Sequence, residues 1–233
     1  MKTAAFCDLG LMAYAEAYAL QINLAARRHQ GVLDTDLFLV VEHPSVFTLG
    51  RRGGREHLGV TPAFLANRNI GLVPIERGGD ITYHGPGQLV VYPIINLRQA
   101  RMSVSDYVYR LEAVMLGIAA DFGVVAGRDR RNHGIWVGNN KLGSIGIAIR
   151  HSITFHGLAL NINTDLEPFS WINPCGLRNI GMTSLALERG SDCPMDTVQS
   201  RLRHHLPEVF GVRLQPLDTA ALTAHSNPPE PLP

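Results

Sequence analysis

The sequence predicts an α+β fold in which a mixed or antiparallel sheet packs against helices. Strand-like apolar runs come in groups, helical periodicities stand apart from them, and no regular strand–helix alternation indicates a doubly wound sheet. With 45% hydrophobic and 18% charged residues, the chain has the composition of a folded protein rather than a disordered one. We expect one domain over residues 1–217 and a Pro-rich, flexible tail over 218–233, where the last seven residues hold four prolines and should fray.

Short runs rich in β-branched and aromatic residues predict the strands. The run 37–41 is continuously apolar, which is typical of a strand covered on both faces. Pro93 predicts an edge or a bulge at the end of its strand, because proline cannot donate to a ladder. The small polar residues 138–140 accept a positive φ, so a hairpin is expected around them. The expected strands are 37–41, 46–49, 88–95, 135–137, 142–149 and 153–162, with further candidates within 73–97.

Helical spacing of apolar residues predicts three helices. The first covers 11–30 and stops before Gly31, which suits a C-terminal cap. The second begins at Ser103, with Asp106 three residues later as in a capping box, and continues to Gly123. The third spans 194–206.

Composition and charge exclude several function classes. A formal net charge of +1 provides no global field for binding nucleic acid or a membrane surface. Cys7, Cys175 and Cys193 form no C-x-x-C pair, so neither a disulfide framework nor a zinc ribbon is expected. No uncharged apolar run approaches the ~20 residues of a membrane helix, and the N-terminal stretch lacks a signal-peptide pattern. We therefore expect a cytoplasmic protein.

The densest signal for a binding site is the segment 77–88, which contains four glycines and one proline. Glycine at this density lets the backbone approach a ligand closely. The segment lacks the Gly-Lys-Ser/Thr of a phosphate loop and the G-x-G-x-x-G of a dinucleotide site. Arg77, Tyr83 and His84 favour a binding loop, and an irregular turn between strands is the alternative.

Lys141 begins an apolar strand and has only small neighbours over 140–146. Burying an ammonium group is costly. The side chain therefore either extends into solvent or has a depressed pKa that suits proton transfer.

Cys175 stands between Pro174 and Gly176, in a turn that could present its sulfur to a pocket. Amides of a following turn could stabilise a thiolate there. The alternative is a small buried hydrophobic residue, as we expect for Cys7 and Cys193.

Two further groups of residues give weaker signals for a site. A zinc site is disfavoured because no pair of candidate ligands has the required spacing on one element; the candidates are His84, His133, His151, His156 and Cys175. Two basic clusters are expected to be solvated loops or a docking surface for an acidic partner; they are Arg51, Arg52 and Arg55, and Arg128, Arg130 and Arg131.

Taken together, these segments resemble the lipoyl(octanoyl) transferase family of lipoate biosynthesis. The signature R-G-G-x-x-T-Y-H-G-P-G-Q is present without a gap at 77–88 and is followed by Tyr92-Pro93. The family's other elements are similar to Glu42-His43-Pro44, Phe47-Thr48-Leu49-Gly50-Arg51, Lys141-x-x-Ser144-Ile145-Gly146, Gly157-Leu158-Ala159-Leu160-Asn161 and Asn173-Pro174-Cys175-Gly176. The resemblance covers residues 9–210.

The resemblance implies an acyltransferase that moves an octanoyl group from octanoyl-acyl carrier protein to a lysine of a lipoyl domain. Its fold would be the catalytic domain shared with biotin and lipoate protein ligases. Cys175 would carry the acyl group as a thioester, and Lys141 would be the general acid/base. Substrate would be bound by Arg77, Gly78, Gly79, Asp80, Ile81, Thr82, Tyr83, His84, Ser144, Ile145, Gly146, Gly157, Leu158 and Ala159.

The same resemblance implies which partners and cofactors to expect. The acceptors would be lipoyl domains of 2-oxoacid dehydrogenase complexes and the glycine cleavage H protein, and no metal, nucleotide or other diffusible cofactor is required. Backbone amides near Gly78, Gly79, Gly146 and Gly157 are candidate oxyanion donors. An ATP-dependent ligase, with residues 50–55 as a faint nucleotide loop, and a non-catalytic acyl-binding module are the alternatives.

Overall fold

The computed structural model describes residues 1–173 and 180–223. The large sheet contains β1 (Lys2–Leu11), β2 (Asp36–Glu42), β6 (Gln88–Ile94), β7 (Gly127–Arg128), β8 (Gly134–Val137), β9 (Asn140–Arg150), β10 (Ile153–Asn161), β11 (Gly181–Met182) and β12 (Val212–Pro216). Within the described residues its order is β12-β1-β2-β6-β10-β9-β8-β7, and β11 pairs with β9. The sheet is mixed, since β1 runs parallel to β2 and β12 whereas β2, β6, β10, β9 and β8 are antiparallel in succession.

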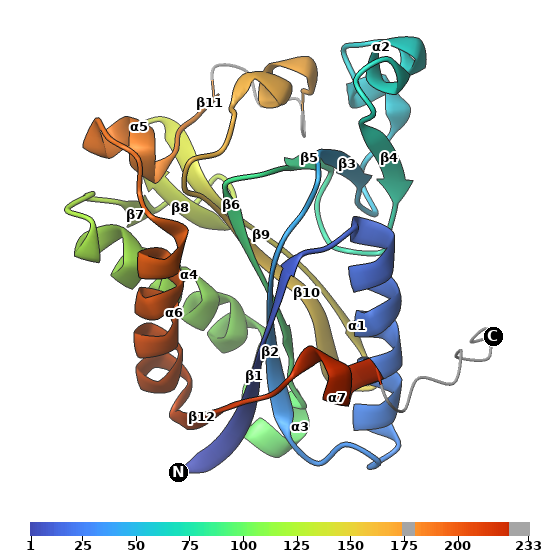
Figure 1. The fold of residues 1–233 in the computed structure, drawn as a ribbon, viewed down its shortest axis with the longest axis vertical. Helices are drawn as coiled ribbons and strands as arrows, with labels where there is room; N and C mark the ends of the chain where they lie inside the picture. Colours follow the sequence, from blue (N-terminus) through green and yellow to red (C-terminus); the bar gives the residue numbers. More distant parts are fainter. Residues whose placement is uncertain (174–179, 224–233) are drawn as a thin grey trace.

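A small sheet lies at one end of the large one (Figure 1). Its strands are β3 (Val46–Leu49), β4 (Gly71–Pro74) and β5 (Ile81–His84), in the order β4-β3-β5. The helices are α1 (Tyr14–His29), α2 (Pro62–Ala66), α3 (Leu97–Ala100), α4 (Val104–Asp121), α5 (Leu185–Arg189), α6 (Met195–Phe210) and α7 (Thr219–Thr223), with short 3₁₀ turns η1 (Arg55–His57) and η2 (Glu167–Trp171). This α+β architecture is the predicted one.

Helices cover both faces of the large sheet (Figure 1). Helix α1 packs on one face, and α4 and α6 pack on the other. Successive residues of β2 alternate between the two cores: Phe38 and Val40 face α4 and α6, whereas Leu37, Leu39 and Val41 face α1. The continuous apolar run therefore marks a strand covered on both faces, as predicted.

Most of the predicted elements are confirmed, with shifted ends. Ser103 caps α4, because its hydroxyl accepts a hydrogen bond from the amide of Asp106. The hairpin forms between β8 and β9. The predicted first helix begins at Tyr14 rather than residue 11, because the residues before it form β1. No local pattern predicted β1, because its partners β2 and β12 stabilise it from distant parts of the chain.

The expectation of an edge strand at Pro93 is wrong, but the pairing of β6 with β10 stops at Val91, opposite Leu158, so the ladder is interrupted at Pro93 on that side. Pro93 pairs with Phe38, and β6 lies between β2 and β10. The physical reason is the glycine next to it: a Cβ on Gly157 would lie 2.7 Å from Cδ of Pro93. Because Gly157 has no side chain, the pyrrolidine ring fits inside the sheet.

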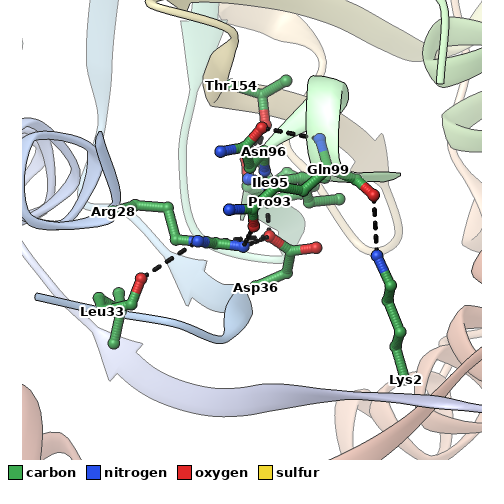
Figure 2. Close-up of polar contacts among 9 residues, drawn as sticks. All are labelled: Lys2, Arg28, Leu33, Asp36, Pro93, Ile95, Asn96, Gln99 and Thr154. Atoms are coloured by element: carbon green, nitrogen blue, oxygen red, sulfur yellow. Dashed lines mark hydrogen bonds and ion pairs between the residues drawn. The ribbon is translucent and has the colours of Figure 1, made fainter. Parts of the chain in front are cut away.

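A buried polar network ties the end of α1 to the sheet (Figure 2). Arg28, only 4% exposed, donates from Nε and Nη2 to Oδ1 of Asp36 at 3.1 and 3.0 Å. Its guanidinium also donates to the carbonyl of Leu33 and to Oε1 of Gln99. The same Asp36 oxygen accepts the amide of Asn96, so one carboxylate joins α1, β2 and the segment after β6.

The described part of the predicted tail, 218–223, includes α7, where Leu222 is buried and packs with the α1-side core. The hydroxyl of Thr219 donates to the carbonyl of Asp8 in β1. The last seven residues lie outside the described part of the chain. No helix within 1–173 or 180–223 combines the length and the apolar character needed to cross a membrane.

Candidate functional site

A cavity of about 310 Å³ lies between the large sheet and the small sheet. Its floor is formed by residues of β9 and β10, and its roof by the loop 77–80 that leads into β5. Trp136 and Lys141 lie at one part of its wall, and Tyr14 of α1 contributes to another. The cavity therefore collects residues from both sheets and from α1.

The floor is open because its residues are small. Gly146 pairs with Gly157, and Ser144 pairs with Ala159, across β9 and β10. All four line the cavity. A narrow apolar ligand can lie along this stretch because these four residues carry no large side chain.

The roof is fixed to the floor and to the small sheet by hydrogen bonds. The amide of Gly78 donates to the carbonyl of Ile147 at 2.8 Å. Arg77 donates from Nη2 to the carbonyl of Thr48 at 2.8 Å, and from Nε and Nη2 to the Thr48 hydroxyl. These hydrogen bonds fix the position of the Gly-rich loop above β9. They also occupy the Gly78 amide, which is therefore not a free oxyanion donor.

Lys141 lies in the cavity wall and does not extend into solvent. It is 8% exposed, and Nζ lies 5.2 Å from the centre of the Trp136 ring. Its backbone is held on both sides, opposite Trp136 in β8 and Met182 in β11. Of the two alternatives for this lysine, the structure supports the buried one.

The segments on either side of 174–179 border the same cavity. Asn173 and Ile180 both line it, and the amide of Asn173 donates to the carbonyl of His57 at 2.9 Å. Nδ1 of His57 lies 2.6 Å from Oδ2 of Asp80, a roof residue. Hydrogen bonding to Asp80 raises the pKa of His57 above its usual value. Cys175 and the rest of its predicted turn up to Asn179 lie outside the described residues.

Four polar aromatic and imidazole side chains line the cavity together: Tyr14, His84, Tyr92 and His156. They come from α1, β5, β6 and β10 and are each 1–7% exposed. The Tyr14 and His84 rings stack with centroids 5.8 Å apart, and the Tyr92 and His156 rings lie 6.3 Å apart. Tyr14 Oη lies 3.5 Å from Nδ1 of His156. We call this group the polar wall.

The imidazoles in and behind the polar wall are neutral near pH 7. Burial, reinforced by the neighbouring His43, lowers the pKa of His84 to about 3. Burial lowers the pKa of His43 to about 4 and also lowers the pKa of His156. Nδ1 of His84 lies 2.7 Å from Oε1 of Gln88 and donates to it, because an amide oxygen can only accept. The Nε2 group of Gln88 donates to the carbonyl of Tyr83 and to Oδ1 of Asn161. Nε2 of neutral His84 is therefore an acceptor.

The structure brings together almost all the residues that the resemblance assigned to substrate binding. Every one of them lines the cavity except Tyr83. The Tyr83 ring packs between Phe47 and Phe169, and its hydroxyl hydrogen-bonds with Ser45. No sequence signal assigned Tyr14 or Trp136 to the site, and His156 was a candidate only as a metal ligand, since the contribution of all three depends on distant elements.

Of the histidines considered for the disfavoured zinc site, His84 and His156 both line the cavity, whereas His133 and His151 lie elsewhere. His133 lies 3.5 Å from Glu112, and His151 stacks on His29. Cys7 and Cys193 are buried in the two cores, as expected of small hydrophobic residues. Within the described residues, metal-type ligands converge only at the surface of α6, at His204, His205 and Glu208.

Comparison with known proteins shows similarity to one family of enzymes. The family model of the lipoyl protein ligase A/B catalytic domain matches residues 13–207. An octanoyltransferase from Desulfotalea psychrophila is 55% identical over 206 residues, which cover 88% of this chain and 92% of that protein. An octanoyltransferase from Syntrophobacter fumaroxidans is 43% identical over 210 residues, covering 90% and 92%.

Solved structures share the fold at low identity. Lipoate-protein ligase A bound with ATP has a TM-score of 0.74 and 13% identity, covering 96% of this chain and 92% of that one. A bi-partite lipoate protein ligase from Thermoplasma acidophilum has a TM-score of 0.73 and 14% identity, covering 96% and 90%. The predicted relation of the fold to lipoate protein ligases is confirmed. On the family match and the close relatives, the chain belongs to the lipoyl protein ligase A/B catalytic domain family and is an acyltransferase of the octanoyltransferase type.

Proposed function

We propose that this octanoyltransferase takes its acyl group from octanoyl-acyl carrier protein and delivers it to one lysine of a lipoyl domain. The acceptors are the lipoyl domains of 2-oxoacid dehydrogenase complexes and the glycine cleavage H protein. Cys175 carries the octanoyl group between the two half-reactions, and Lys141 transfers the protons. The enzyme acts in the cytoplasm, where reducing conditions keep Cys175 a thiol.

One observation carries the proposal: a slot floored by glycine and alanine has buried Lys141 in its wall and Asn173, two residues before Cys175, at its border. Six methylenes of an octanoyl chain contribute roughly 5 kcal/mol when moved from water into such a slot. This binding energy holds the thioester close to Lys141.

In the first half-reaction the Cys175 thiolate attacks the thioester carbonyl of the donor. A new C–S bond forms to Cys175, the C–S bond to pantetheine breaks, and Lys141 gives a proton to the departing sulfur. In the second, a lysine amine of the acceptor attacks the Cys175 thioester. A C–N bond forms, the C–S bond breaks, and Lys141 accepts the proton released by the amine. Cys175 and Lys141 thus return to their starting states.

No bond in this cycle needs activation by a nucleotide or a metal, because the donor is already a thioester. We expect transfer in the presence of a chelator and without ATP. Free octanoate with ATP should give no product. Product from octanoate and ATP would instead indicate a ligase.

The test is acyl-enzyme formation. Wild-type protein incubated with octanoyl-acyl carrier protein should gain the mass of one octanoyl group on Cys175, and Cys175→Ser should abolish transfer. Cys193→Ser is the matched control, because Cys193 is buried in the α4 and α6 core away from the cavity. Lys141→Met keeps the apolar stem and should lower the rate about 10²- to 10⁴-fold. An unmodified wild type, or acylation on another residue, refutes the Cys175 mechanism.

A further inference from the structure

A group of metal-type ligands lies on the surface of α6, on the side of the large sheet opposite α1 (Figure 1). His204, His205 and Glu208 each offer one ligand atom, and these atoms all lie within 4.8 Å of one another. Residues three and four positions apart on a helix share a face, so Glu208 lies beside both histidines. Among the described residues that line the cavity, none belongs to this cluster. The cluster is therefore separate from the acyl-transfer site.

His205 is held in place by α4. Its ring lies against Gly117, where a Cβ would come within 2.6 Å of Nδ1 and 2.7 Å of Cε1. Nε2 of His205 lies 2.8 Å from Oδ2 of Asp121, the last residue of α4. Because an ionised carboxylate only accepts hydrogen bonds, Nε2 carries the proton, and Nδ1 of the neutral ring keeps a lone pair. A histidine that donates to a carboxylate through one nitrogen and offers the other is typical of metal ligands.

The two imidazoles face the carboxylate of Glu208 at separations that suit a shared ion. Nε2 of His204 lies 3.6 Å from Oε1, and Nδ1 of His205 lies 4.0 Å from Oε2. Both distances exceed the roughly 3 Å of a hydrogen bond. Zinc bonds nitrogen and oxygen at about 2.1 Å, so the ligand atoms of a tetrahedral site are about 3.4 Å apart. The side chains of His204 and Glu208 are more than half exposed and can rotate to reach these separations.

We propose that His204, His205 and Glu208 bind a zinc ion, with water as the fourth ligand and Asp121 as a positioning residue that orients His205. Two imidazoles and one carboxylate suit zinc, whereas Mg²⁺ and Ca²⁺ prefer oxygen ligands. Asp121 is not itself a ligand, since its Oδ2 already accepts from His205 and lies 3.8 Å from Nε of Arg201. The bound ion joins α6 to α4 through His205. The alternative is a set of surface ion pairs without a metal.

The test is zinc binding, measured by equilibrium dialysis and metal analysis on untagged full-length protein. The parent protein carries Cys175→Ser, which removes a thiol that could compete for zinc. Cobalt(II) is the second probe, because its visible spectrum reports a four-coordinate site. His204→Ala and Glu208→Gln each remove one ligand, and Asp121→Asn keeps all three. His151→Asn is the matched control: it removes an exposed histidine that stacks on another histidine away from α6, and asparagine tolerates the positive φ at this position.

The parent protein should bind one zinc ion per chain, and cobalt should give the spectrum of a four-coordinate ion. Asp121→Asn should weaken zinc binding about 10- to 100-fold, and loss of a ligand in His204→Ala or Glu208→Gln should weaken it further. His151→Asn should bind zinc as the parent does. The proposal is overturned if the parent binds no zinc, as expected of ion pairs alone, or if His204→Ala loses no more affinity than His151→Asn. Because the measurement is of bound metal, its outcome is independent of the proposed octanoyl transfer.

Discussion

Alanine in place of Gly146 tests whether the roof lies directly on the floor. A Cβ at this position would lie 2.8 Å from Cδ of Arg77 and 3.3 Å from the carbonyl oxygen of Gly78. Arg77 cannot turn aside without losing its hydrogen bonds to Thr48. Gly78 is held by its bond to the carbonyl of Ile147. The added methyl must therefore lift the loop 77–80 away from β9.

The expected magnitudes follow from these contacts. Forcing one methyl into a packed site costs about 1–3 kcal/mol of unfolding free energy. A roof displaced by about 1 Å misplaces the acyl chain, and such an error lowers the rate about 10²-fold. We therefore expect Gly146→Ala to fold, with reduced stability, and to lose about two orders of magnitude in kcat/KM for octanoyl transfer.

Urea unfolding and single-turnover acylation measure the two effects. Gly127→Ala is the matched control, because a Cβ there meets no heavy atom within 4 Å and Gly127 is not at a cavity wall. This control should change the unfolding free energy by less than about 1 kcal/mol and leave transfer unaffected. If Gly146→Ala matches Gly127→Ala in both assays, the close contact between roof and floor is refuted.

Three other predictions follow from the structure. Asp36→Asn should lower the unfolding free energy by about 2–4 kcal/mol, since it leaves a buried guanidinium without its carboxylate, and transfer at 25 °C should persist; a smaller loss in urea unfolding contradicts this. The depressed pKa values of His43 and His84, about 4 and 3, mean that the unfolded chain binds more protons below pH 6.5. Unfolding free energy should therefore fall by about 2 kcal/mol per histidine between pH 7 and pH 5, and equal stability at both values excludes it. Arg51 and Arg52 are exposed on the loop bonded to the roof. Reversing both charges should raise KM about tenfold for the phosphopantetheine-bearing carrier, but not for octanoyl-pantetheine, which lacks the phosphate. Equal effects on the KM of both donors would contradict a docking role.

Local signals were sufficient where one segment determines its own structure. The Ser103 cap and the periodicity after it predicted α4, because both act within one helix. The glycines of 77–88 predicted close backbone approach, which the roof shows at Gly78. In contrast, β1 contains three alanine or cysteine positions that favour no strand by themselves, and its parallel partners lie 31 or 32 residues away in β2 and 210 residues away in β12.

The polar wall could not be predicted for the same reason. Its four residues come from four elements, so no spacing within any one segment marks them as a group. His156 was a candidate only as a metal ligand. Its positive φ could not be predicted, because the sequence signal for that backbone conformation is glycine and not histidine. The position of Pro93 inside the sheet could not be predicted, because its neighbour Gly157 is 64 positions later in the chain.

The loop 50–53 bears on the choice between thioester exchange and nucleotide-dependent activation. This loop is the first part of residues 50–55, the faint counterpart of a nucleotide loop in the sequence, and the fold is shared with a lipoate-protein ligase A bound with ATP. A loop that cradles phosphate needs backbone amides free to point at it. Here the amides of Gly50, Arg51 and Arg52 donate to the carbonyls of residues 80, 77 and 79, and Gly53 donates within the loop. The amides of residues 50–52 therefore hold the roof of the cavity and are not available to phosphate, which favours a donor that arrives already activated as a thioester.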